Sequence, residues 1–141
     1  MPPAKPRPQT TRPFRAASSP SRPLRPRRFT HAHRQRLQRA VQHYLEECYR
    51  RVTAARVSEC AAFLELTVPY LSRIAPEILG MPLLRHMRQN QVAHAAKLLL
   101  AGPLQAEDIA LRAGFGSVPT FYKWFRAVHG MTPGEFREVK K

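Results

Sequence analysis

The chain has 141 residues, enough for one domain of ordinary size or for a smaller domain with a tail. Its formal net charge of +15 and its pI near 11.3 favour a polyanionic partner, most often nucleic acid. The charge is uneven: residues 1–45 hold eleven Lys and Arg and no acid, and thirteen basic and nine acidic residues follow. The sequence contains neither an apolar run of membrane-spanning length nor the apolar core of a secretory signal. We therefore expect a reduced, cytoplasmic protein.

Residues 1–30 are rich in proline and arginine and contain eight of the fourteen prolines. They show almost no hydrophobic periodicity, so they cannot bury enough surface to offset their ordering entropy, and we predict a disordered tail. One interpretation is an arm that follows phosphates and adds salt-sensitive affinity. The other is an inert extension or a wrongly chosen start site, and a charge run alone does not decide between them.

Cys48 and Cys60 are too few for a disulfide framework and lack the spacing of a metal site. Both fall on apolar-leaning faces of predicted helices, so we interpret them as buried structural thiols rather than as a redox switch. The closest histidine pair, His31 and His33, lies at a helix entrance and not in a ligand cluster. We expect no metal and no cofactor.

Apolar residues recur at helical spacing from residue 33 onward and predict an amphipathic first helix. Its stripe consists of Leu37, Val41, Tyr44, Leu45, Cys48 and Val52. A short helix is predicted near residues 57–65. A third is predicted over 68–75, where Thr67 can cap the first turn and Pro69 is tolerated near the start. Pro76 should limit how far this helix continues.

Gly80 is predicted as a C-terminal stop for the helix before it. A long helix then follows over residues 82–101 and ends at Gly102 and Pro103. Three more helices are predicted over residues 106–113, 118–128 and 133–139, the last two capped by Ser117 and Thr132. No segment alternates with period two over a useful length, so we expect no sheet. The predicted class is all-α, with about seven helices.

The chain contains an internal repeat in which each copy is a helix, a turn and a second helix. The aligned pairs are Ala61 with Ala110, Leu66 with Phe115, Val68 with Val118, Pro69 with Pro119, Leu71 with Phe121, and Arg73 with Lys123. The offset changes from 49 to 50, which we attribute to an additional residue, Ser117, in the second turn. This pattern is typical of a helix-turn-helix, whose second helix enters the DNA major groove. The long helix between the copies spans ~30 Å, close to the ~34 Å between successive major-groove faces.

The C-terminal unit resembles the signature region of the AraC/XylS family of bacterial transcription regulators. The residues that carry the resemblance are Ile109, Ala110, Ala113, Gly114, Phe115, Ser117, Phe121, Phe125, Gly130, Thr132, Pro133, Phe136 and Arg137. The upstream unit matches through Ala61, Leu66, Tyr70, Leu71, Ser72, Arg73, Gly80 and Met81. The resemblance implies one DNA-binding domain over residues 31–141. Its first helix-turn-helix lies at about 57–76, its linker helix at about 82–101 and its second helix-turn-helix at about 106–128.

The family pattern also implies which side chains face DNA. In the first unit they are Pro69, Tyr70, Ser72 and Arg73, and in the second they are Val118, Pro119, Thr120, Tyr122 and Lys123. The guanidinium of Arg73 matches guanine O6 and N7, with a phosphate contact as its alternative, and Lys123 offers a point charge. Candidate phosphate contacts are Arg85, Arg112, Arg126 and Arg137. The aromatic residues Phe115, Phe121, Trp124, Phe125 and Phe136 resemble the family's core.

The first unit departs from the family pattern at two positions. Glu65 stands where the family usually has a turn glycine, and a left-handed residue there would cost ~1 kcal/mol. Its carboxylate also brings negative charge near the DNA face. Pro76 stands where the first reading helix normally continues. We therefore predict that the second unit dominates DNA affinity.

The resemblance implies double-stranded DNA as the partner of a monomer, with RNA polymerase as a candidate second partner. In place of the family's usual separate ligand-binding domain, this chain has only the tail. It therefore resembles the stand-alone members, whose activity is set by abundance. We find no paired carboxylates, nucleophile–base set or phosphate loop, so we expect no catalytic residues and no enzyme. Two alternatives stay open: a non-specific architectural protein with a degenerate first unit, and the detached DNA-binding end of a longer sensor. Activation and repression are both compatible with the sequence.

Overall fold

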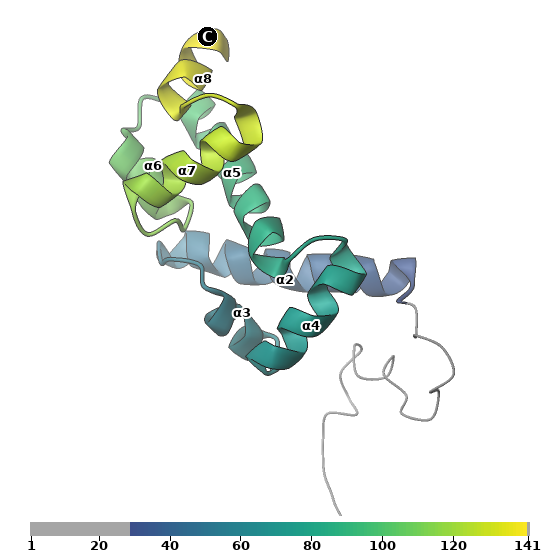
Figure 1. Cartoon of the computed structure of the whole chain (residues 1–141). Helices are drawn as coiled ribbons and strands as arrows, with labels where there is room; N and C mark the ends of the chain where they lie inside the picture. Colours follow the sequence, from purple (N-terminus) through teal and green to yellow (C-terminus); the bar gives the residue numbers. More distant parts are fainter. Residues whose placement is uncertain (1–28, 141) are drawn as a thin grey trace, which may run out of the picture.

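The computed structural model describes residues 29–140 (Figure 1). The described residues form seven helices and no strand, which confirms the predicted all-α class. The predicted disordered tail lies outside the described residues, apart from Phe29 and Thr30.

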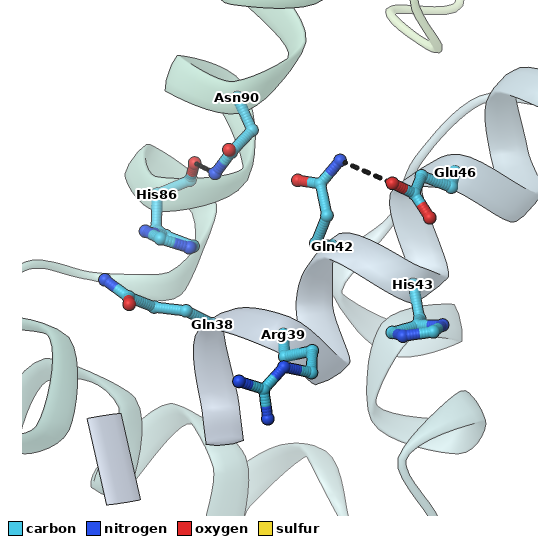
Figure 2. Close-up of a pocket in the computed structure, with 7 residues that line it drawn as sticks. All are labelled: Gln38, Arg39, Gln42, His43, Glu46, His86 and Asn90. Carbon is cyan, nitrogen blue, oxygen red and sulfur yellow. Dashed lines mark hydrogen bonds between the residues drawn. The ribbon is translucent and has the colours of Figure 1, made fainter. Parts of the chain in front are cut away.

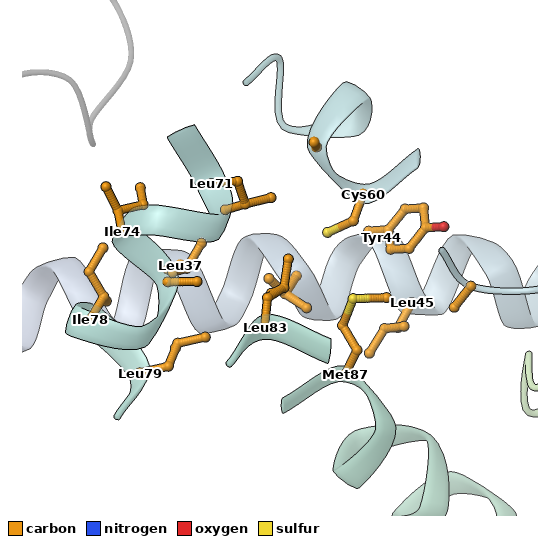
Figure 3. Packing of buried hydrophobic residues seen from close by; sticks show 14 of the residues in the cluster. Leu37, Tyr44, Leu45, Cys60, Leu71, Ile74, Ile78, Leu79, Leu83 and Met87 are labelled. Atoms are coloured by element: carbon orange, nitrogen blue, oxygen red, sulfur yellow. The ribbon is translucent and has the colours of Figure 1, made fainter. Parts of the chain in front are cut away.

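The first half of the fold consists of three helices packed around the start of a fourth. These are α2 (His31–Arg51), α3 (Val57–Phe63), α4 (Val68–Leu79) and the first turns of α5 (Leu83–Ala101). Thr30 caps α2: its hydroxyl accepts from the His33 backbone N–H at 3.2 Å, and the His33 ring accepts from the Thr30 N–H at 2.9 Å. The predicted apolar stripe of α2 faces this core from Leu37 to Cys48, and Figure 3 shows Leu37, Tyr44 and Leu45 of it. Val52, predicted as the last member of the stripe, instead follows the end of α2 and is exposed.

The second half is built on the remaining turns of α5. It adds α6 (Ala106–Arg112), α7 (Val118–His129) and α8 (Pro133–Lys140). Its buried residues are Val92, Ala95, Leu99, Ile109, Ala110, Ala113, Phe115, Phe121, Phe125 and Phe136. The aromatic residues predicted to pack therefore do so, and Trp124 lies partly buried against them.

One helix is thus shared between two hydrophobic cores. Leu83 and Met87 of α5 belong to the first core, and Val92, Ala95 and Leu99 to the second. In Figure 1, α3 and α4 lie at one end of α5, and α6, α7 and α8 lie at the other. The 19 residues of α5 span about 28 Å. The two helix-turn-helix units therefore pack on opposite halves of α5.

The C-terminal ends of two helices differ from the sequence prediction by two residues or more. The prediction ended α4 at Ala75, but the helix passes through Pro76 and ends at Leu79. Pro76 and Ser72, whose carbonyl loses its helical donor, are both exposed, so water can satisfy that carbonyl. The buried Ile78 and Leu79 favour continuation of the helix. The other difference is at α3, which ends at Phe63 rather than at Glu65.

Candidate nucleic-acid interface

Helices α4 and α7 are built alike from end to end. Thr67 and Ser117 cap them, and their hydroxyls accept from the N–H of Tyr70 at 3.2 Å and of Thr120 at 3.3 Å. Each helix has 12 residues and begins with Val-Pro. They end at Gly80 and Gly130, whose φ values are 80° and 73°. Caps and ends therefore correspond at a constant offset of 50 residues.

The turns that precede these helices also correspond, at an offset of 49. Leu66 N–H donates to the Ala61 carbonyl and Phe115 N–H to the Ala110 carbonyl, both at 2.9 Å. Since Thr67 and Ser117 are equivalent caps, the additional residue of the second turn lies before Ser117. It is Gly116, with φ 83°. Our assignment of the additional residue to Ser117 was therefore wrong.

Each of the two helices exposes a stripe of five residues at spacing i, i+3, i+4, i+7 and i+8. The first stripe is Pro69, Ser72, Arg73, Pro76 and Glu77. The second stripe is Pro119, Tyr122, Lys123, Arg126 and Ala127. Both lie opposite the buried faces of their helices, so each helix presents one continuous surface to the outside.

The cation in the middle of each stripe lies over an aromatic ring. The guanidinium carbon of Arg73 is 5.2 Å from the centre of the Tyr70 ring, and Lys123 Nζ is 5.6 Å from that of Trp124. Such contacts restrict a long side chain without removing its charge. Both cations are exposed and available to an external partner.

Three residues predicted to read DNA lie at the edges of the stripes rather than on them. Tyr70, Val118 and Thr120 are half-buried. The Thr120 hydroxyl is 2.9 Å from the Ser117 hydroxyl and so belongs to the cap of α7. The other six predicted residues, Pro69 and Pro119 included, lie on the stripes.

The four arginines predicted to contact phosphate fall into different settings. Arg126 belongs to the second stripe, and Arg85 and Arg112 are exposed at the start of α5 and the end of α6. Arg137 is different, because its guanidinium donates to three backbone carbonyls, those of Leu99, Gly102 and Leu104, each at 3.0 Å. These bonds tie α8 to the C-terminal end of α5, so they give Arg137 a role within the fold.

The two stripes differ in charge. In the first, Glu77 offsets Arg73, whereas the second carries Lys123 and Arg126 without an acid. Glu65, at the turn before α4, has φ 62°, which is a left-handed conformation. The second helix-turn-helix therefore presents the more positive surface.

A polar groove of about 480 Å³ runs between α2 and α5 (Figure 2). Its lining residues are Gln38, Arg39, Gln42, His43, Glu46, His86 and Asn90. Several of these groups are already bonded to one another: Gln42 donates to Glu46 at 3.2 Å and Asn90 to the His86 carbonyl at 2.8 Å. None of the lining residues belongs to either stripe.

Within residues 29–140, the cysteines, the potential metal ligands and the helix compositions bear on other kinds of site. This part of the chain holds no group of three or more His, Cys, Asp or Glu that could bind a metal ion. Cys48 and Cys60 are buried free thiols. No helix within the same range combines the length and apolar composition needed to cross a membrane.

A protein-family model described as a helix-turn-helix domain matches residues 60–138, which include both stripes. The chain belongs to the AraC-type helix-turn-helix family. Members of this family are DNA-binding transcription regulators.

Two curated relatives of the family are similar to the chain over part of their length. The HTH-type transcriptional activator AarP of Providencia stuartii is 40% identical over 68 residues, which are 48% of this chain and 50% of AarP. The probable transcription factor PqrA of Proteus vulgaris is 36% identical over 69 residues, which are 49% of this chain and 57% of PqrA. The chain thus spans about half the length of these relatives.

A solved structure shows the same architecture. It is the C-terminal domain of the two-component response regulator yesN from Fusobacterium nucleatum, with 27% sequence identity and a TM-score of 0.63. The likeness covers 72% of this chain and 98% of that domain.

Sequence reasoning did not single out three residues that the structure places on the stripes or between the two cores. Glu77 and Ala127 complete the two stripes, and extending the repeat by one helical turn at offset 50 would have found them. Gln91 is fully buried on α5. The sequence signal that could have found Gln91 is its position among apolar residues spaced four apart along α5, which places its polar side chain on the buried face.

Proposed function

We propose that this chain is a sequence-specific transcription regulator that reads two consecutive major grooves of double-stranded DNA as a monomer. The observation that carries the proposal is the pair of matched stripes on α4 and α7, at opposite ends of one rigid helix. The length of α5, about 28 Å, is close to the ~34 Å repeat of the major groove. An α-helix with an exposed polar stripe is the element that the major groove admits.

Within this proposal the side chains have different roles. Arg73 contacts guanine through its two parallel donors, and Ser72 and Tyr70 support this contact. In the second groove, Lys123 and Tyr122 contact base edges. Pro119, Val118 and the Thr120 methyl group lie nearest to thymine methyl groups at the start of α7.

Phosphate contacts in the proposal come from Arg85, Arg112 and Arg126, which are exposed. We leave Arg137 out, because three carbonyls already use its donors. The second unit supplies most of the affinity, since its stripe is the more positive and its turn has glycine where the first has Glu65.

The remaining parts of the proposal concern the whole protein. Residues 31–141 form the DNA-binding domain, and the Pro/Arg-rich segment before them adds non-specific affinity. The protein acts on the nucleoid in the cytoplasm, and RNA polymerase is its second partner. AarP is named a transcriptional activator, which supports activation as the regulatory effect.

One observation favours a second candidate function. Glu77 makes the first stripe electrically neutral, and Glu65 lies close before it. A first unit that no longer reads bases would leave a non-specific or architectural DNA-binding protein, whose affinity comes from charge alone.

Binding-site selection from random duplexes with the full chain tests the proposal. We expect an asymmetric motif whose two halves lie one helical turn apart, ~34 Å between centres. The variants Arg73→Ala and Lys123→Ala should each relax one half, whereas Lys97→Ala, which removes an exposed charge from α5, should leave the motif unchanged. A pool without enrichment, combined with binding that fades steeply in salt, would support the architectural protein instead.

A further inference from the structure

Gln91 is the one buried polar side chain among the described residues, and it lies where the two cores meet. Along α5 it follows Met87 of the first core and precedes Val92 of the second. Burying an amide is costly unless its donor and its acceptor both find partners. A polar residue at this place therefore calls for an explanation beyond packing.

The Gln91 amide is bonded on both sides. Its Nε2 donates to the Ala113 carbonyl at 2.8 Å, and its Oε1 accepts from Arg88 Nη1 at 2.9 Å. The Arg88 guanidinium carbon also lies 5.8 Å from the centre of the Phe115 ring. Gln91 and Arg88 thus hold the turn between α6 and α7 against the middle of α5.

The loop between α2 and α3 docks on the same turn. The N–H of Ala55 donates to the Gly114 carbonyl at 2.8 Å. A Cβ at Gly114 would lie 3.1 Å from Gln91 Nε2 and 3.4 Å from the Thr53 carbonyl oxygen. The close approach of these three segments therefore depends on glycine at position 114.

Two features next to this loop point to a constrained geometry. Val52 has φ 56° and ψ 52°, a left-handed conformation that a β-branched residue rarely adopts. Such strain persists where the surroundings determine the backbone path. Three residues earlier, the Tyr49 ring stacks on His94 of α5, with centroids 3.9 Å apart and planes 4° from parallel.

We infer that these contacts form a positioning site that sets the distance and angle between α4 and α7. The inter-unit junction, as we name it, consists of Tyr49, Arg88, Gln91, His94 and the Ala55–Gly114 backbone bond. It fastens α2 to α5 through the Tyr49–His94 stack, the turn before α7 to α5 through Gln91, and the loop after α2 directly to that turn through the Ala55–Gly114 bond. These attachments restrict rotation of one unit relative to the other about α5. The junction thereby determines which spacing between two half-sites the chain accepts. This inference rests on the proposed two-groove function.

Full-length variants separate the junction from the rest of the fold. Gln91→Met keeps the length and approximate volume of the side chain but replaces its amide with an apolar thioether, which removes both hydrogen bonds. Tyr49→Leu removes the ring stack at a half-buried position, and Tyr49→Phe keeps it as the matched control. If Gln91→Met does not fold, Tyr49→Leu carries the test.

The first readout is affinity for duplexes that carry the selected motif with one base pair inserted or removed between its halves. Each insertion moves one half by ~3.4 Å and turns it by roughly 35° relative to the other. The wild type and Tyr49→Phe should lose about tenfold or more in affinity, because both units can no longer bind together. Gln91→Met and Tyr49→Leu should lose less than about threefold. A purely structural role would weaken binding at every spacing by the same factor, and that result would overturn the inference.

The second readout needs no DNA. Spin labels at Glu77→Cys and Ala127→Cys, exposed on α4 and α7, report the distance between the reading helices. Cys48 and Cys60 should not react with the spin-label reagent, since both are buried and burial raises the pKa of Cys60 to about 12.

We expect one narrow distance distribution in the wild type and a broad one in Gln91→Met and Tyr49→Leu. An unchanged distribution in folded variants would overturn the inference. If selection yields no two-part motif while the distribution still broadens, the proposed function fails and the positioning role of the junction stands.

Discussion

Two residues outside the helices, Val52 and Glu65, hold left-handed backbone conformations without being glycine. They differ in what surrounds them. Val52 begins the loop that docks on the second unit, whereas Glu65 occupies the turn position that Gly114 occupies in the other copy. At such a position the backbone must adopt a positive φ, which glycine does at little cost and other residues do not. Glu65 therefore introduces backbone strain into the first unit.

Replacing Glu65 with glycine should relieve this strain. We expect Glu65→Gly to raise the free energy of unfolding by about 0.5–1 kcal/mol, because the left-handed cost of ~1–2 kcal/mol exceeds the entropy lost by glycine. Urea denaturation measures the change. The control Gln89→Gly, at an exposed position inside α5, should lower stability by about 1 kcal/mol. A loss of stability in Glu65→Gly would contradict the strain argument.

Gly114 and Gly130 both have positive φ, yet only Gly114 lies against other atoms. Gly130→Ala should cost about 1 kcal/mol of stability for its backbone conformation alone. Gly114→Ala should cost about 2 kcal/mol or more, since its Cβ would also press on Gln91 and the Thr53 carbonyl. Equal losses in thermal or urea unfolding would show that the contact around Gly114 is loose.

At the scale of the elements, the repeat determines most of what could be predicted. Helix starts depend on local signals, and the caps at Thr67 and Ser117 were both predicted correctly. Helix ends depend more on tertiary burial. At Pro76 a local rule predicted a stop, but burial of Ile78 and Leu79 outweighed it.

Pro76 should therefore cost the protein stability. Pro76→Ala restores a donor to the Ser72 carbonyl, and we expect the free energy of unfolding to rise by about 1–2 kcal/mol. Pro69→Ala is the matched control at the start of the same helix, where proline loses no helical bond, and it should change stability little. Equal changes in the free energy of unfolding for Pro76→Ala and Pro69→Ala, measured by urea denaturation, would contradict this explanation.

The inter-unit junction marks the limit of prediction from sequence. Gln91 and Ala113 are 22 residues apart, and their bond depends on how α6 packs on α5. The stripes were largely predictable, since they follow from the helical period and the repeat. The hydrogen bonds of Arg137 to three backbone carbonyls could not be predicted, because these partners lie 33 to 38 residues away in the sequence.

At the scale of the whole molecule, two small cores share one helix, and three histidines couple their stability to pH. Burial lowers the pKa of His86, His94 and His129 below 6.5, and the nearby cations Arg34, Lys97 and Lys140 act in the same direction. The folded state therefore binds fewer protons than the unfolded state just below this value.

Stability should be greatest above about pH 6.5 and should fall as the pH drops through the lowered pKa values of the folded state. Urea denaturation at pH 7.5 and pH 5.0 measures this loss. His94→Phe keeps a ring against Tyr49 and removes one titrating group, so its pH dependence should be shallower than that of the wild type. A pH-independent free energy of unfolding over this range would contradict the assignment.

The central claim is that α4 and α7 each read their own half of one site. Affinities of the wild type, Arg73→Ala and Lys123→Ala for the selected duplex, and for duplexes with either half scrambled, test it most directly. We predict that Arg73→Ala costs ~1–3 kcal/mol on the intact site and nothing once the first half is scrambled, with Lys123→Ala behaving likewise toward the second half. If each variant loses the same free energy on intact and scrambled duplexes, the two helices do not read separate halves, and the claim is wrong.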